Sequence, residues 1–157
     1  MTKANNGSGN NEARDEWQTP QKLWDQLNNQ YSFTFDCCAN EENTKCNSFS
    51  SDFKMDLDII SKEDICWMNP PFSKAREMFD CFFINIRKGI AIYRFDNPET
   101  KLWQEVIFPK ATWIFIPKGR VNYENLEGHG ARFPSALIGF NVPYPKGVEG
   151  TIFTVKD

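Results

Sequence analysis

The stretch Ile65-Cys66-Trp67-Met68-Asn69-Pro70-Pro71-Phe72 joins four apolar residues to two consecutive prolines. The apolar run predicts a buried strand over residues 65–68, and Ser73 predicts the cap of a helix that follows. Each proline fixes its own φ angle and removes a backbone donor, and the residue before a proline is kept out of helical geometry. We therefore expect a stiff, extended corner at the carboxyl end of a strand. It holds an amide side chain, a backbone carbonyl and an aromatic ring in one small space.

The groups of this corner suit an amine attached to an aromatic base. The lone pair of such an amine is delocalised into the ring, so the amine is a poor nucleophile. The Asn69 side-chain oxygen and the Pro70 carbonyl can accept hydrogen bonds from the two N–H groups of this amine. These bonds favour the pyramidal form of the amine and stabilise the positive charge that develops on the attacking nitrogen. Phe72 can stack on the base, so that orientation supplies much of the catalysis. We therefore predict methyl transfer onto a nitrogen, with Asn69, Pro70, Pro71 and Phe72 as the catalytic residues.

Helix and strand patterns alternate along most of the chain. The first helix is expected after Thr19 as cap and Pro20 as first helical residue, the second from Ser73 to a stop at Gly89, and the third from Asn97 to the residue before Pro109. Strands are expected over residues 31–36, 65–68, 90–93, 112–116, 120–123 and 135–140, with an edge strand over 151–155, and residues 41–51 are expected to form a loop.

This alternation favours an α/β fold with a mostly parallel sheet. The last strands have no helix between them, which predicts a hairpin with one antiparallel C-terminal strand. Ligands of such sheets bind outside the carboxyl ends of the strands. Asp36 and Asn69 both follow predicted strands, so we expect them to face one crevice.

The charge balance excludes a broadly basic nucleic-acid-coating protein, because the formal net charge is −3. A polynucleotide would need a local basic patch instead. The candidates are Lys74, Arg76, Arg94, Lys101, Lys118, Arg120 and Arg132. Ordinary solvated charge is the alternative for each of them.

The 5 cysteines and the single histidine give no strong metal signal. An odd cysteine count without a secretion signal fits reduced thiols in a cytoplasmic compartment. A zinc site formed by Cys37, Cys38 and Cys46 is an alternative. However, the spacing of these cysteines matches no common ligand pattern, and His129 is distant in sequence. Buried thiols that act as small apolar side chains are the preferred interpretation, so no metal is predicted.

The ends of the chain bear on its domain organisation. Residues 1–14 are rich in Asn and Gly and lack the apolar region of a signal peptide, so a disordered tail is expected there. No apolar run approaches the ~20 residues that span a membrane. Residues 15–157 are expected to form a single domain, without a separate target-recognition domain.

An ordered series of short motifs runs over residues 15 to 140. It comprises Asp15-Glu16-Trp17 with Thr19-Pro20, Phe35-Asp36, Cys38-Ala39, Asn43, Lys45-Cys46, the Asn69–Phe72 corner, Thr100-Lys101 with Trp103, Lys118-Gly119-Arg120 and Phe133-Pro134-Ser135-Ala136-Leu137. In this order the motifs resemble the phage-type, Dam-like DNA N6-adenine methyltransferases of phages and prophages.

The resemblance implies a Rossmann-like methyltransferase fold, S-adenosylmethionine as the methyl donor and the N6 amine of adenine in DNA as the acceptor. It also implies a site-specific enzyme, located in the bacterial host cytoplasm if the protein is phage-encoded. The residues that it assigns to the cofactor are Trp17, Thr19, Pro20, Asp36, Cys37, Ala39 and Asn69. One aspartate among Asp52, Asp56 and Asp58 could accept a hydrogen bond from the cofactor's adenine, and the choice stays open. The turn after Asp36 departs from many such enzymes because it lacks glycine.

A target adenine lies inside the DNA stack, so base flipping is expected. Phosphate contacts would then position the DNA, and the residues expected to make them are Lys74, Lys101, Lys118, Arg120 and Arg132. Without a recognition domain, we expect a short target site or low specificity. Two alternatives remain: a methyltransferase of an RNA base or a protein glutamine amide, and an inactive binding protein on a methyltransferase scaffold.

Overall fold

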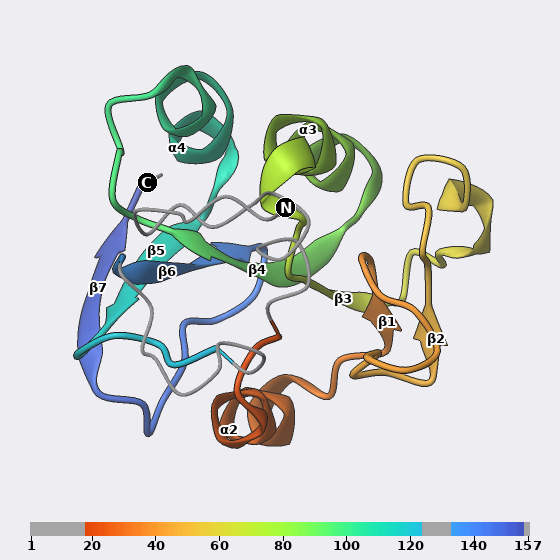
Figure 1. The fold of residues 1–157 in the computed structure, drawn as a ribbon, viewed down its shortest axis with the longest axis horizontal. Helices are drawn as coiled ribbons and strands as arrows, with labels where there is room; N and C mark the ends of the chain where they lie inside the picture. The colour runs from red at the N-terminus through yellow and green to blue at the C-terminus, as the bar shows by residue number, and fades with distance from the viewer. Residues whose placement is uncertain (1–17, 124–132, 156–157) are drawn as a thin grey trace, which may run out of the picture.

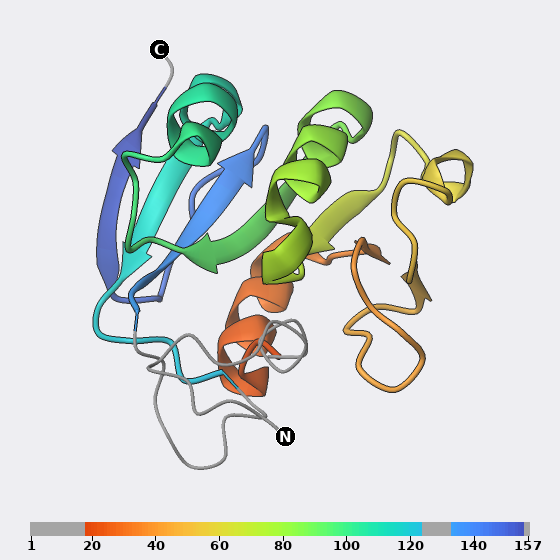
Figure 2. The same ribbon diagram turned by 45° about the horizontal axis from the view of Figure 1, so that its top comes forward.

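A single mixed sheet forms the centre of the protein. The structure is a computed structural model that describes residues 18–123 and 133–155. Within these residues the sheet has 7 strands in the order β2-β1-β3-β4-β6-β5-β7. They are β1 (Phe35–Asp36), β2 (Ser48–Phe49), β3 (Ile65–Met68), β4 (Lys88–Arg94), β5 (Trp113–Pro117), β6 (Ser135–Phe140) and β7 (Gly150–Thr154). Figure 2 shows β2 and β7 at opposite edges.

The strands β2, β1, β3 and β4 are mutually parallel. Strand β6 is antiparallel to both β4 and β5, and β7 is antiparallel to β5. Strand β5 therefore runs in the direction of β1 to β4, and the mostly parallel sheet is confirmed. The expected single antiparallel strand is corrected to two, β6 and β7. No described helix lies between β5 and β6, so β6 can reverse direction and pair antiparallel with β5. Strand β7 runs in the same direction as β6, because both are antiparallel to β5.

Helices cover both faces of the sheet (Figure 1). The described helices are α2 (Gln21–Tyr31), the 3-10 helices η1 (Leu57–Ile59) and η2 (Phe72–Lys74), α3 (Ala75–Asn85), the π-helix η3 (Leu102–Ile107) and α4 (Phe108–Lys110). Helices α3 and α4 lie on one face and α2 on the other. The result is a three-layer α/β/α arrangement.

Two apolar clusters fill the spaces between these layers. In β3, Cys66 and Met68 belong to the cluster under α3, whereas Trp67 belongs to the cluster under α2. Strand β5 alternates in the same way, with Ile114 on the α3 side and Trp113 on the α2 side. Because both faces are buried, the strands read as continuous apolar runs rather than as an apolar/polar alternation.

The helix starts differ from the sequence prediction. Pro20 occupies the N-cap of α2, and no side chain caps that helix, so Thr19 is not the cap. Ser73 lies inside η2, and α3 begins at Ala75, again without a side-chain cap. The cause is the proline corner, because the Lys74 N–H donates to the Pro71 carbonyl at 3.0 Å and closes a 3-10 turn before the α-helix starts.

Two predicted helix ends were also wrong. Helix α3 ends at Asn85, and Gly89 is already part of β4. The third helix does not stop before Pro109, which lies in the first turn of α4. Helix α4 directly continues the π-helix η3, since the Phe108 N–H donates to the Trp103 carbonyl, so Pro109 lies close to the end of one continuous helical stretch.

Several strands and a loop differ from the bounds predicted from apolar periodicity. Tyr31 still belongs to α2, and β1 comprises only Phe35–Asp36. The expected loop over 41–51 contains the two residues of β2. Residues 120–123 are not a strand, because Gly119 with φ of 81° turns the chain away after β5.

Candidate active site

The proline corner lies where three parallel strands end together. Asp36 at the end of β1 pairs with Trp67, two residues before Asn69. Ala91 of β4 pairs with Met68, so the last residues of β4 run beside the corner. The carboxyl ends of β1, β3 and β4 therefore share one edge.

A buried threonine fixes the side chain of Asn69. Its Nδ2 donates to the Thr19 hydroxyl at 3.3 Å, and Thr19 is only 1% exposed. With the amide nitrogen held there, the direction of the carbonyl oxygen is also determined. The sequence assigned Thr19 to the cofactor, whereas the described contact connects it to the predicted catalytic residue.

A cavity of about 330 Å³ adjoins this asparagine. Its walls come from the turn after β1, the segment after β2, the corner and the first turn of α3. The lining residues are Cys37, Cys38, Ala39, Asn40, Asn43, Ser51, Asp52, Lys54, Asn69, Pro71, Lys74, Glu77 and Met78. The volume falls in the range of small-molecule sites, roughly 300–1,000 Å³. The cavity thus brings together five of the predicted residues: Cys37, Ala39, Asn69, Pro71 and Lys74.

Asp36 holds the turn that lines this cavity, although Asp36 itself is not a lining residue. Its buried carboxylate accepts the Lys45 N–H at 3.0 Å and the Cys38 N–H at 3.4 Å. Burial raises the pKa of Asp36 to about 6, although these two N–H bonds counteract part of that effect. Asp36 is not among the lining residues, and its contact with a cofactor stays a prediction.

The segment after β2 separates the three candidate aspartates. Asp52 lines the cavity. Asp56 instead accepts the Ser50 hydroxyl at 2.6 Å, and Asp58 lies in η1, outside the lining set. Of the three, Asp52 is the one among the lining residues, and which of them contacts a cofactor stays a prediction.

Phe72 turns away from this cavity toward β4. Its ring meets those of Tyr93 and Phe133 edge-on, with centroids 5.5 and 5.6 Å apart. The guanidinium of Arg94 lies 5.5 Å from the Phe72 centroid. Pro70 is buried and Phe72 half-buried, and Phe72 is not among the residues that line the cavity beside Asn69.

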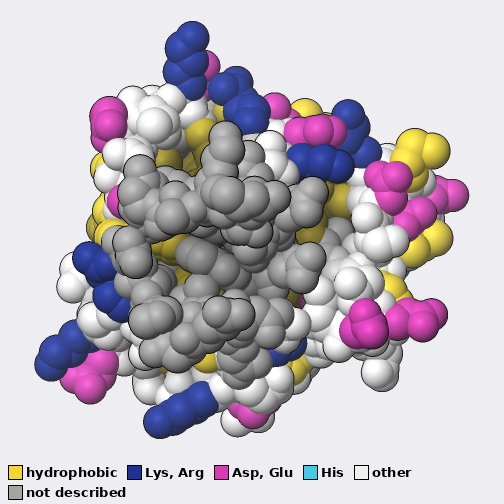
Figure 3. All heavy atoms as spheres, viewed as in Figure 1, with side chains coloured by type: hydrophobic (Ala, Val, Ile, Leu, Met, Phe, Trp, Pro, Cys, Tyr) yellow, Lys and Arg dark blue, Asp and Glu magenta, His cyan; other side chains and the backbone are white. Residues whose placement is uncertain are grey.

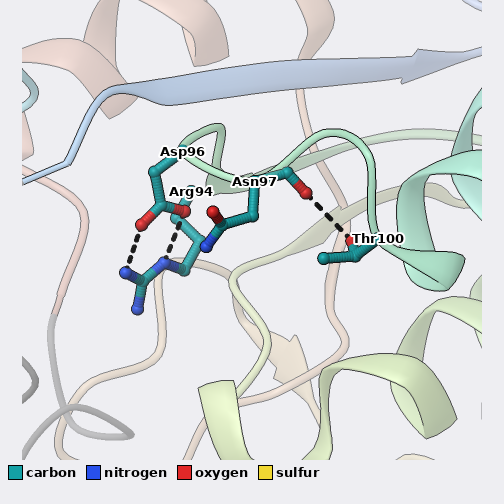
Figure 4. Close-up of polar contacts among 4 residues, drawn as sticks. All are labelled: Arg94, Asp96, Asn97 and Thr100. Carbon is teal, nitrogen blue, oxygen red and sulfur yellow. Dashed lines mark hydrogen bonds and ion pairs between the residues drawn. The ribbon is translucent and has the colours of Figure 1, made fainter.

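A second polar group follows β4 and was not identified from the sequence. Arg94 forms a two-point ion pair with Asp96, shown in Figure 4. A cavity of about 290 Å³ adjoins it, lined by Tyr93, Arg94, Asp96, Asn97, Thr100, Leu102 and Trp103. Sequence reasoning placed Arg94 in a basic patch and overlooked Asp96. Their spacing of two residues after a strand was the available signal, because such residues can share one face.

The predicted DNA-binding residues that the structure describes do not all line one cavity, since Lys74 lines the cavity beside Asn69. Lys118 and Arg120 line a third cavity of about 490 Å³ together with Pro20, and the exposed Lys118 lies 3.8 Å from Glu149. Lys101 is exposed just before η3. On the face in Figure 3, basic and acidic side chains are interspersed around the periphery. Trp17, His129 and Arg132 lie outside the described residues.

The cysteines are all free thiols. Four of them are buried and Cys38 is intermediate, in agreement with a role as small apolar side chains. Among residues 18–123 and 133–155, no three His, Cys, Asp or Glu side chains are grouped so that they could hold a metal ion. No helix in the described parts of the chain is long and apolar enough to cross a membrane.

The fold and the site together define an α/β protein with a ligand cavity at the carboxyl edge of parallel strands and an amide-proline corner in its wall. The family model of the DNA N-6-adenine-methyltransferases (Dam) matches residues 7–132, and the chain belongs to this family. The match spans Thr19, Asp36 and the corner, so the resemblance seen in the sequence is confirmed. A comparison with curated proteins finds no match. The family name denotes enzymes that methylate the N6 amine of adenine in DNA.

Proposed function

We propose that the protein transfers a methyl group from S-adenosylmethionine to the N6 amine of an adenine flipped out of DNA, on a Rossmann-like scaffold. One observation carries this proposal: Asn69 belongs both to the corner and to the wall of the cavity, and Thr19 orients its amide. The family supports adenine in DNA as the acceptor. The cluster under α2 draws on residues from α2 to β6 and beyond, and the cluster under α3 on residues from β1 to β6, which supports one domain.

The cavity suits the proposed donor in its chemistry. The Asp52 carboxylate can accept from hydroxyl or amine groups, the Lys54 and Lys74 ammonium groups can pair with a carboxylate, and Met78 offers an apolar wall. The small Cys37 and Ala39 occupy the turn where related enzymes carry glycine. When bound, S-adenosylmethionine supplies an electrophilic methyl group on a sulfonium. Thr19 would act through Asn69 and Asp36 through the turn, while Pro20 lines a different cavity and Trp17 stays a predicted contact.

The acceptor would be held by the corner. The Asn69 carbonyl oxygen and the Pro70 carbonyl accept the two N–H groups of the adenine amine, and their dipoles stabilise the charge that develops on nitrogen. Phe72 contributes a stacking face, which limits the base to orientations near attack. Two prolines fix the backbone of this corner before the substrate arrives, so little reorganisation is needed.

DNA would be held by backbone contacts around the site. Flipping the base costs a few kcal/mol, and phosphate contacts can offset this cost without reading sequence. Lys74 stands at the first cavity and Lys118 and Arg120 at the third, while Lys101 and Arg132 stay predicted contacts. We expect a short target site, which sequencing of DNA methylated in vitro would reveal; a long, strict site would contradict this expectation.

The direct test is incubation with labelled S-adenosylmethionine and unmethylated DNA, followed by nucleoside analysis. Label is expected on N6-methyladenine, and Asn69→Ala should lower kcat by roughly 100- to 1,000-fold, the usual effect of removing one transition-state hydrogen bond. Asn85→Ala is the matched control, because that exposed asparagine ends α3 while the corner precedes its start. Full activity of Asn69→Ala would contradict the proposed role of the corner.

Two further arms separate the alternatives. In a competition assay, RNA or a glutamine-containing peptide is added together with DNA. Preferential labelling of either competitor would identify it, and not DNA, as the acceptor. Calorimetry with the donor distinguishes an inactive binding protein, which would bind it without transferring the methyl group.

A further inference from the structure

The Arg94–Asp96 pair lies beside the corner and not at a distance from it. Both residues follow or end β4, whose Ala91 pairs with the last residue of β3. The Asp96 carboxylate accepts from Arg94 at two points, Nε at 2.9 Å and Nη2 at the second oxygen (Figure 4). Such a fork fixes the guanidinium plane far better than a single contact.

The surroundings of the pair add to its rigidity. The two side chains are only 22% and 25% exposed. The hydrogen bond from Arg94 lowers the pKa of Asp96 and likewise raises the pKa of Arg94, so both stay charged near neutral pH. Between them, the Phe95 N–H donates to the Pro134 carbonyl at 2.7 Å. The pair is thus tied to the segment that carries Phe133.

The held guanidinium lies over two aromatic rings. Its central carbon is 4.4 Å from the Phe133 centroid and 5.5 Å from the Phe72 centroid. Phe72 also meets Tyr93 edge-on, with an interplanar angle of 88°. Arg94, Phe133 and Tyr93 all contact the Phe72 ring and therefore restrict its plane.

We propose that Arg94, locked by Asp96, is a positioning residue that holds the Phe72 ring in the plane on which the flipped adenine stacks. This inference rests on the proposed function. It separates Arg94 from the phosphate-binding residues, because the Asp96 carboxylate already pairs with the Nε and Nη2 edge of the guanidinium and balances its charge.

A double-mutant cycle on the full-length protein tests the inference. Arg94→Lys keeps the charge but loses the fork, Asp96→Asn keeps the arginine but loosens it, and Phe72→Leu removes the ring. Each is expected to lower kcat for DNA on the order of tenfold to a hundredfold, with KM for DNA and donor affinity little changed. Arg94→Lys should have almost no further effect in the Phe72→Leu background, since residues that act through one another are not additive.

The control is Asp80→Asn, which breaks the 3.6 Å contact between Arg76 and Asp80 on α3 and should leave kcat unchanged. Independent, additive losses would overturn the inference, as would unchanged kcat in Arg94→Lys and Asp96→Asn. A raised KM with a shallower salt dependence would instead identify Arg94 as a phosphate contact. If the wild-type protein methylates no adenine, the proposed function fails first; an active wild type with additive losses refutes only the positioning role.

Discussion

Two walls of the cavity beside Asn69 obtain their shapes in different ways. The corner Asn69–Phe72 is held by its covalent structure. Pro71 sits at a φ of −61°, as its ring requires, and at an extended ψ of 133°. The turn Cys37–Asn40 contains neither proline nor glycine. Its backbone is held instead by the Asp36 carboxylate and by a bond from the Ala39 N–H to the Ser50 carbonyl at 2.9 Å.

This contrast teaches where the site is vulnerable. A proline ring does not titrate and needs no partner, so the corner keeps its backbone shape under most conditions. The turn depends on a buried carboxylate whose charged form is costly. We therefore expect pH to act on the turn and single side-chain changes to act on the corner.

The largest expected effect concerns Asp36. Its pKa is raised from 3.8 to about 6 by burial, so the folded state binds a proton more tightly than the unfolded chain. The stability that this proton provides is present below about pH 4 and is lost as pH rises to about 6. Asp36→Asn abolishes this titration. The free energy of unfolding of the variant, relative to wild type, should rise by on the order of 3 kcal/mol across this window.

Urea unfolding of both proteins at a series of pH values measures this difference. The half-exposed Asp80, changed in the same way, reports the background effect of losing a carboxylate. A constant difference between Asp36→Asn and wild type from pH 4 to 6 would show that Asp36 does not titrate there.

A smaller effect is expected from Thr19→Val. Valine preserves the shape of the buried threonine but cannot accept the Asn69 amide, and one such bond contributes about 0.5–1.5 kcal/mol. We expect kcat to fall by up to about tenfold, with donor affinity unchanged, and Thr19→Ser to restore the rate. Steady-state kinetics with donor titration checks this. Weaker donor binding at unchanged kcat would favour the cofactor role that the family resemblance implies.

The smallest effect is expected from Pro71→Ala. Alanine accepts the same backbone angles, and the Pro71 carbonyl keeps its bond to the Lys74 N–H. The unfolded chain gains freedom, so the free energy of unfolding should drop by about 0.4–1 kcal/mol, which thermal denaturation measures. Turnover should change little. A large loss of turnover without loss of stability would show that the second proline, and not only Asn69, sets the site geometry.

Much of the corner was predictable because its determinants are local. The strand over residues 65–68 and the shared edge with Asp36 both followed from apolar runs and proline stereochemistry. The predicted helix caps were wrong for a related reason. Thr19 and Ser73 have good capping side chains. However, the Thr19 hydroxyl accepts a hydrogen bond from the Asn69 amide, and Ser73 lies in the 3-10 helix that follows the corner.

The Arg94–Asp96 pair and the Asp36 turn depend on long-range contacts. Phe133 reaches Arg94 from a segment beyond β5, and Lys45 returns to Asp36 across nine residues. The apolar periodicity of a sequence indicates local helices and strands, so it cannot predict contacts of this kind. The direction of β6 has the same origin, since it pairs with β4 only after the chain has passed through β5.

The sequence by itself determined the α/β class, the rigid Asn69–Phe72 corner and the family, because apolar patterning and proline geometry act between neighbouring residues. Only the tertiary structure decided which side chains surround that corner. It placed Thr19 against the Asn69 amide, the Asp36 carboxylate behind the turn and Arg94 over the Phe72 ring. These choices follow from packing and from the need to satisfy buried polar groups, which depend on segments far apart in the chain.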